Sequence, residues 1–147
     1  MFKRILVPTD GSELAGKAVT LAIGLARTHG ASVVTLHVIP HLPGAHYGAA
    51  APFLKQLEGD YEKHQREQSA VILDAVAKDA ASAGVATQAV VVVADDVYAQ
   101  IVDVAKQHGC DLICMGSHGR SGMAAVVLGG QTHKVLIHSH IPVLVVR

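Results

Sequence analysis

Residues 112–122 read Leu-Ile-Cys-Met-Gly-Ser-His-Gly-Arg-Ser-Gly, a short apolar run that leads directly into a loop rich in glycine. Similar apolar runs, rich in β-branched residues, occur four more times in the chain: Arg4 to Val7, Val33 to Ile39, Ala89 to Val93 and Val143 to Val146. None of the runs alternates cleanly between apolar and polar residues. Near-continuous apolar runs are typical of parallel strands that helices cover on both faces. The sequence therefore predicts five short, buried, parallel strands.

Segments with helical periodicity separate the five runs. We expect helices at four places: Leu14 to Ala26, with Ser12 as N-cap and Gly30 as stop; Leu54 to Ala80, closing at Gly84 and with Gly59 breaking its first turns; Val97 to Ala105, with Asp95 or Asp96 as cap and Gly109 as end; and Thr132 to Ser139. The order is then β-α-β-α-β-α-β-α-β. Because crossovers between parallel strands are right-handed, this order predicts an α/β fold with one open, doubly wound parallel sheet and helices on both faces.

Composition limits the class of protein. The 147 residues are 50% apolar and 16% charged, with 12 Lys and Arg against 12 Asp and Glu. A chain of this length is expected to form one domain, residues 1–147, and to bury about 70% of its unfolded surface. The balanced charge argues against nucleic acid or an anionic membrane as the main partner. With no long apolar span and no signal-peptide pattern, we expect a cytoplasmic protein.

Cys110 and Cys114 are expected to be a reduced, packed pair.

The glycine-rich loop after the fourth run is the strongest candidate for a binding site. One glycine cluster spans residues 116–122, and a second, Gly129 and Gly130, precedes the last expected helix. Glycines allow backbone N–H groups to approach anionic oxygens, and the N-terminus of a helix favours phosphate. In doubly wound sheets, ligands bind beyond the carboxyl ends of the strands. The alternative is a glycine-rich turn that serves only to leave the sheet.

Other motifs carry less weight. Residues 11–18 match G-x-x-x-x-G-K, but Ala18 replaces the magnesium-binding hydroxyl and the helical period already begins at Leu14, so the match is interpreted as coincidental. No G-x-S-x-G elbow and no G-x-G-x-x-G after the first strand is present. The ten histidines have no recognised metal-ligand spacing; His37 is expected to be a packed strand residue, and His41 and His46 to lie on a loop. No metal site is therefore predicted.

The spacing Gly116-x2-Gly119-x9-Gly129 resembles the ATP-binding signature of the universal stress protein family. Four further segments resemble that family's patterns: Ile5 to Ser12, Leu36 to Ile39, Asp111 to Gly116 and Ile141 to Val146. The resemblance covers the whole chain. It implies the strand order 3-2-1-4-5, in which the first and fourth strands lie side by side and form the switch point.

The resemblance also implies roles for individual residues. An adenine and ribose site would be formed by Pro8, Thr9, Asp10 and Val38, with the backbone around Val38 facing the adenine edge. The nucleotide would be lined by Met115 and Gly116, and its phosphates held by Gly119, Gly129, Gly130, Gln131 and Thr132. A magnesium or other divalent ion would be carried mainly by the phosphates. Two further residues, His118 and Arg120, lie in the phosphate loop, where Arg120 either clamps a phosphate or is solvated at the rim.

One position departs from the family signature. The last glycine is usually followed by Ser or Thr, whereas here Gly130, Gln131 and Thr132 follow Gly129. The loss of one hydrogen bond to a charged group weakens binding by roughly 1.5–3 kcal/mol, unless backbone N–H groups or Thr132 compensate.

The residues and the resemblance together predict an ATP-binding, cytosolic regulator or sensor of stress. A homodimer through Val143 to Val146 is also expected, because the family pairs its fifth strands. Without such pairing, this segment would be an exposed apolar edge of the sheet. No catalytic residue is assigned, and any ATP hydrolysis is expected to be slow. Two alternatives remain. One is a scaffold of the same fold that binds no nucleotide. The other is an ATPase or nucleotidyl transferase that uses Asp10, His118 and Arg120.

Overall fold

The computed structural model describes residues 1–43, 52–119 and 128–147. Strands and helices alternate along the chain: β1 (Arg4–Pro8), α1 (Glu13–His29), β2 (Ser32–Ile39), α2 (Pro52–Ser82), β3 (Thr87–Val93), α3 (Val97–Gln107), β4 (Leu112–Gly116), α4 (Gly130–His138) and β5 (Val143–Val146). The five strands form one parallel sheet with the order β3-β2-β1-β4-β5. The predicted fold class and the order 3-2-1-4-5 are confirmed.

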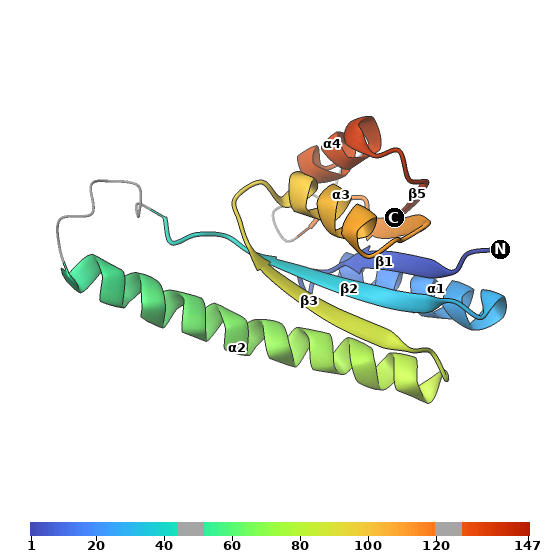
Figure 1. Cartoon of the computed structure of the whole chain (residues 1–147), viewed down its shortest axis with the longest axis horizontal. Helices are drawn as coiled ribbons and strands as arrows, with labels where there is room; N and C mark the ends of the chain where they lie inside the picture. Colours follow the sequence, from blue (N-terminus) through green and yellow to red (C-terminus); the bar gives the residue numbers. More distant parts are fainter. Residues whose placement is uncertain (44–51, 120–127) are drawn as a thin grey trace.

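Helices cover both faces of the sheet, α1 and α2 on one and α3 and α4 on the other (Figure 1). Successive side chains of a strand point to opposite faces. Ile5 accordingly packs into the core under α1 and α2, whereas Leu6 packs into the core under α3 and α4, and both are fully buried. This double burial is the physical reason that the strand sequences do not alternate.

Helix α1 begins and ends where the sequence predicts. The Ser12 hydroxyl accepts a hydrogen bond from the Ala15 N–H at 3.3 Å, and Gly30 closes the helix in the left-handed conformation, with φ of 66°. Gly16 and Lys17 therefore lie inside the helix, where they cannot form a phosphate-binding loop. The interpretation of the G-x-x-x-x-G-K match as coincidental is confirmed.

Helix α2 differs from the prediction because it continues without a break through Gly59. Glycine costs about 1 kcal/mol relative to alanine inside a helix, but its backbone adopts helical angles readily. The buried residues of α2 all lie in its second half, from Ser69 onward, and its first half extends past the strands (Figure 1). Across the described residues, no helix has both the length and the apolar character needed to span a bilayer.

The start of α3 differs in part from the prediction. Asp96 occupies the N-cap position of α3, but its side chain makes no capping hydrogen bond. Instead, the Tyr98 N–H donates to Oε1 of Gln131, at 3.0 Å, so a side chain from α4 caps α3. Asp95 accepts a hydrogen bond from the His41 backbone at 3.0 Å and binds the His41 imidazole at 3.1 Å. Of the two aspartates predicted as the cap, Asp96 thus holds the N-cap position without a side-chain hydrogen bond, and Asp95 pairs with His41 instead.

The two cysteines are free, buried thiols, as predicted. Burial raises the pKa of Cys110 and of Cys114 to about 11 in each case. At mildly alkaline pH, below this raised pKa, both side chains stay protonated, and the reactive thiolate is scarce.

We expect native protein at mildly alkaline pH to react very slowly with a thiol reagent such as dithionitrobenzoate, because both thiols are buried and protonated. After unfolding in guanidinium, two thiols per chain should react rapidly. The absorbance of released thionitrobenzoate measures both rates. Rapid labelling of native protein would contradict the buried positions.

Candidate functional site

A cavity of about 370 Å³ lies at the carboxyl ends of β1, β2 and β4, where the sheet order reverses. The first turns of α3 and α4 complete its walls. Its lining comprises Pro8, Thr9, Asp10, Ala15, Leu36, Val38, Val97, Ile101, Met115, Gly116, His118, Gly119, Gln131 and Thr132. Most residues singled out from the sequence are thus brought together in one place. Gly129 and Gly130 lie beside the cavity without lining it, and Arg120 lies outside the described residues.

One wall of the cavity is apolar. Leu36 and Ile101 are at most 1% exposed, and Met115 is 6% exposed. Val38 and Val97 pack against the same core. Four further lining residues were not predicted from the sequence: Ala15, Leu36, Val97 and Ile101. Val97 and Ile101 are spaced i, i+4 at the start of the helix after β3, a signal that indicates a buried helix face but does not distinguish a core from a cavity wall.

The turn after β1 is held by a chain of short hydrogen bonds. The Thr9 N–H donates to Leu36 O at 2.8 Å, and the Thr9 carbonyl accepts from Nδ1 of His37 at 2.9 Å. Because a carbonyl oxygen only accepts, Nδ1 of His37 carries the proton. Gly11 has a φ of 75°, which favours glycine, and Asp10 Oδ1 accepts from the Ser12 N–H at 3.0 Å. His37 is therefore a packed, hydrogen-bonded strand residue, as predicted.

The start of α4 docks on the end of β4 through its own hydrogen bonds. The Gly129 N–H donates to Ser117 O at 2.7 Å, and the Thr132 hydroxyl donates to Gly116 O at 3.0 Å. A Cβ at Gly129 would meet Ser117 O at 3.0 Å and the His118 Cα at 3.1 Å. Glycine fits here without displacing its neighbours, whereas a Cβ would push the chain after β4 and the start of α4 apart by a few tenths of an ångström.

Gly119 brings the loop after β4 against the loop after β1. A Cβ at Gly119 would lie 2.6 Å from Oδ2 of Asp10. Asp10 is itself held by its contact with the Ser12 N–H. The chain after β1 and the chain after β4 therefore meet at the cavity, and a side chain at Gly119 would require the Asp10 carboxylate to shift.

The hydroxyl of Thr132 is not available as a donor to a ligand. Thr132 is 2% exposed, and its proton is committed to the Gly116 carbonyl. Compensation by Thr132 for the absent Ser or Thr at position 130 therefore requires this buried hydrogen bond to break.

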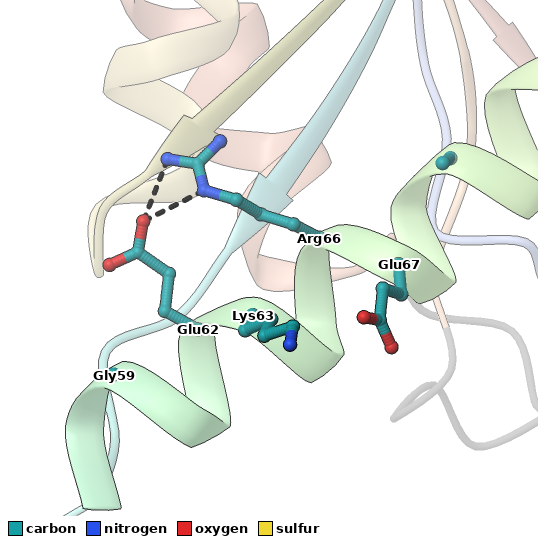
Figure 2. Close-up of a pocket in the computed structure, with 6 residues that line it drawn as sticks. Gly59, Glu62, Lys63, Arg66 and Glu67 are labelled. Carbon is teal, nitrogen blue, oxygen red and sulfur yellow. Dashed lines mark hydrogen bonds and ion pairs between the residues drawn. The ribbon is translucent and has the colours of Figure 1, made fainter. Parts of the chain in front are cut away.

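A second hollow, of about 480 Å³, lies on the outer surface of α2, and Figure 2 shows its lining residues. All of them belong to that one helix. Arg66 and Glu62 form an ion pair at 2.8 Å and thus satisfy each other rather than a ligand. This hollow is shallow and open, so the cavity at the sheet edge is the better candidate site.

The histidines do not assemble with other ligands into a metal centre in the described part of the chain, where no group of three or more His, Cys, Asp or Glu residues gathers. His41 pairs with Asp95, and His46 lies outside the described residues. His118 lines the cavity, and its Nδ1 lies 3.1 Å from the Ser117 hydroxyl.

Comparison with known proteins identifies relatives over the whole length. Residues 1–147 match the universal stress protein family. The chain is 32% identical over 154 positions to the universal stress protein YxiE of Bacillus subtilis, with 100% of both proteins covered. It is also similar to the structure of MJ0577 of Methanocaldococcus jannaschii, at a TM-score of 0.86 and 29% identity, covering 99% and 96% of the two chains. A universal stress protein solved in complex with cAMP has a TM-score of 0.70 and 25% identity, covering 99% and 97%.

The close contact at Gly129 predicts a difference between two adjacent glycines. Gly129→Ala should lower the free energy of unfolding by about 1–3 kcal/mol, because its Cβ meets backbone atoms. Gly130→Ala adds a methyl into open space at the start of α4 and should be neutral or stabilising by up to about 1 kcal/mol. Urea unfolding followed by circular dichroism measures both. Equal stability of the two variants would contradict the docking of α4 on β4.

Proposed function

This chain belongs to the universal stress protein family, and we propose that it binds ATP in the cavity at the carboxyl ends of β1, β2 and β4. The observation that carries the proposal is the division of this cavity into an apolar wall and a wall of glycine backbone. A nucleotide has the same division, with a flat base at one end and anionic phosphates at the other. The cAMP complex of a relative supports an adenine nucleotide as the class of ligand.

The adenine base is assigned to the apolar wall. Leu36 is the last β2 residue paired with β1, and its carbonyl accepts the Thr9 N–H. Because backbone groups in a strand alternate in direction, the N–H and C=O of Val38 face the same side as those of Leu36, at a point beyond the end of β1. These groups can pair with the polar edge of adenine while the side chains of Ile101 and Met115 pack on its faces.

The phosphates are assigned to the glycine side. Helix α4 begins at Gly130, and its N-cap, Gly129, has no side chain to occupy the first N–H groups. Those N–H groups and the helix dipole favour an anion. Gly119 and His118 line the same end of the cavity. A divalent ion would be carried mainly by the phosphates, as in the prediction from the sequence.

The role that fits this site is a regulator or sensor of stress whose conformation or partners depend on bound nucleotide. The Ser117 hydroxyl contacts His118, but Ser117 is buried and does not line the cavity. The hydroxyls of Thr9 and Thr132, which line the cavity, contact the backbone of Gly11 and Gly116. A cytoplasmic location stays a prediction from the sequence.

The first test uses the protein as purified. Acid release followed by mass spectrometry should recover ATP or ADP, and calorimetric titration of nucleotide-free protein with magnesium ATP should give saturable binding near one ligand per chain. Recovery of no nucleotide, together with no binding at high ATP, would favour the scaffold alternative.

A substitution then tests the location of the site. Gly119→Val should weaken ATP binding at least tenfold, because its branched side chain would occupy the end of the cavity assigned to phosphate and its Cβ would displace the Asp10 carboxylate, 2.6 Å away. Gly16→Val places the same side chain into open space on α1 and is the matched control. Both affinities are measured by calorimetry. Undiminished binding by Gly119→Val would place the nucleotide elsewhere.

We also propose that two copies pair through β5. The Ile113 N–H donates to Pro142 O, and the Ser117 N–H donates to Val146 O, so even-numbered residues of this strand face β4. By alternation, Val143 and Val145 direct their backbone groups to the open edge of the sheet. An edge of unpaired groups between apolar side chains is a template for a second strand.

Val145→Pro removes one outward N–H without removing a hydrogen bond to β4. We expect the wild-type protein to be a dimer in light scattering at micromolar concentration and the variant to be a folded monomer. Circular dichroism verifies that the variant is folded. A monomeric wild type, or a variant that is folded and still dimeric, would contradict pairing through this edge.

A further inference from the structure

The acidic residues are unevenly distributed along the chain. None of the 12 Asp and Glu residues lies after Asp111, so α4 and β5 contain no acidic side chain. In α1 and α2, cations pair with carboxylates one turn away, as Arg66 does with Glu62. None of the ion pairs between described residues involves α4. The cations of α4 are therefore left without a carboxylate partner in the part of the chain that the structure describes.

The outward side of α4 combines these cations with an exposed apolar residue. His133, Lys134, Ile137 and His138 are all exposed, whereas Val135 is fully buried. Ile137 is 63% exposed, and His133 and Lys134 precede it by four and three residues, the spacing of neighbours on a helix surface. Helix α4 lies at the periphery of the molecule (Figure 1). These four exposed residues are called the cationic face of α4 below.

Helix α4 packs against α3 and β5, and a residue of α3 holds part of the cationic face in place. The Lys134 ammonium lies 5.0 Å from the centroid of the Tyr98 ring, and the His138 ring lies 5.2 Å from it between centroids. A cation–π contact orients Lys134 without neutralising its charge. The strand β5, Val143–Val146, has no ionisable side chain. The face thus presents oriented positive charge, which lowers the entropic cost of binding an anionic partner.

The arrangement of this face favours a protein as its partner. An apolar residue surrounded by polar groups resembles a protein interface, in which an apolar centre has a polar rim. Lys134 is the one Lys or Arg of the face, whereas an anionic membrane or a nucleic acid backbone is bound by several such residues together. A phosphodiester backbone also offers no apolar group to Ile137. An acidic protein segment offers both carboxylates and apolar side chains.

We propose that the cationic face of α4 is a docking surface for an acidic segment of a partner protein. An apolar side chain of that segment packs on Ile137, and its carboxylates contact Lys134, His133 and His138. None of these four residues lines the cavity at the sheet edge, so this inference does not depend on nucleotide binding.

The first experiment uses a short labelled peptide in which glutamates flank a central leucine. We expect fluorescence anisotropy to show saturable binding of this peptide to the full chain, and increasing salt to weaken it. The same peptide with glutamine in place of glutamate is the control and should not bind. Peptide-induced NMR shift changes should be largest at the backbone amides of α4. No saturable binding at millimolar peptide, or shift changes confined to other elements, would overturn the proposal.

Three variants test the face itself. Ile137→Ser should weaken peptide binding about tenfold, because it removes the apolar contact. Lys134→Glu should weaken it at least tenfold, because it repels the glutamates. Lys78→Glu makes the same change of charge at an exposed position of α2 and should alter the affinity about twofold at most. Circular dichroism verifies that each variant is folded. Equal losses in the two charge reversals would show that only net charge matters and would overturn the proposal.

The histidines of the face should make the docking depend on pH. Imidazole takes up a proton and becomes positive as the pH falls from about 8 to about 6, whereas glutamate stays ionised. Peptide affinity should therefore rise as the pH falls. The double substitution His133→Gln and His138→Gln should remove most of this rise. An unchanged rise in the double variant would overturn the contacts proposed for these two residues.

Other occupants of the face give different results. Binding to vesicles of anionic lipid or to a DNA duplex, without binding to the acidic peptide, would overturn the proposal in favour of a surface for polyanions. A change of oligomeric state in Ile137→Ser, measured by light scattering, would identify a second copy of the chain as the occupant and would also overturn it. Peptide binding that persists in Val145→Pro supports a docking surface separate from the edge of β5.

Discussion

The pairing of β1 with both β2 and β4 is the constraint on which the rest of the structure depends. β1 is the central strand, and the register aligns Ile5 with Val33 on one side and with Leu112 on the other. A central strand is covered by helices on both faces, which requires apolar residues at consecutive positions. The same pairing separates the chain that follows β1 from the chain that follows β4, since α1 lies on one face and α4 on the other. The cavity is the space between them.

Two close contacts bring the loops back together at the mouth of this space. Gly119 lies against the Asp10 carboxylate, and Gly129 lies against the backbone of Ser117 and His118. A Cβ at either position would require the neighbouring atoms to move. The glycine spacing thus has a structural reason, because it allows the chain after β1, the chain after β4 and the start of α4 to approach one another closely.

The first turn of α4 is anchored to two other elements by its polar groups. Thr132 and Gly129 are committed to the end of β4, and Oε1 of Gln131 is committed to α3. The N–H groups of Gly130, Gln131 and Thr132 lie in the first turn of the helix, where no partner within the helix is available to them. These three anchors hold the first turn of α4 against both β4 and α3.

The sequence by itself determined the element order, the parallel sheet and the positions of Ser12 and Gly30 around α1, because these depend on local periodicity and on backbone angles. It also predicted that Asp10, Met115 and Gly119 lie at one site, since the carboxyl ends of parallel strands meet at one edge of the sheet. It did not predict the capping of Tyr98 by Gln131, the commitment of the Thr132 hydroxyl or the contribution of Ile101 to the cavity wall. Each of these joins residues from different elements, and an apolar helix face has the same pattern whether it covers a core or a cavity. Only the tertiary structure decides such contacts, because they depend on the distance and angle at which two packed elements meet.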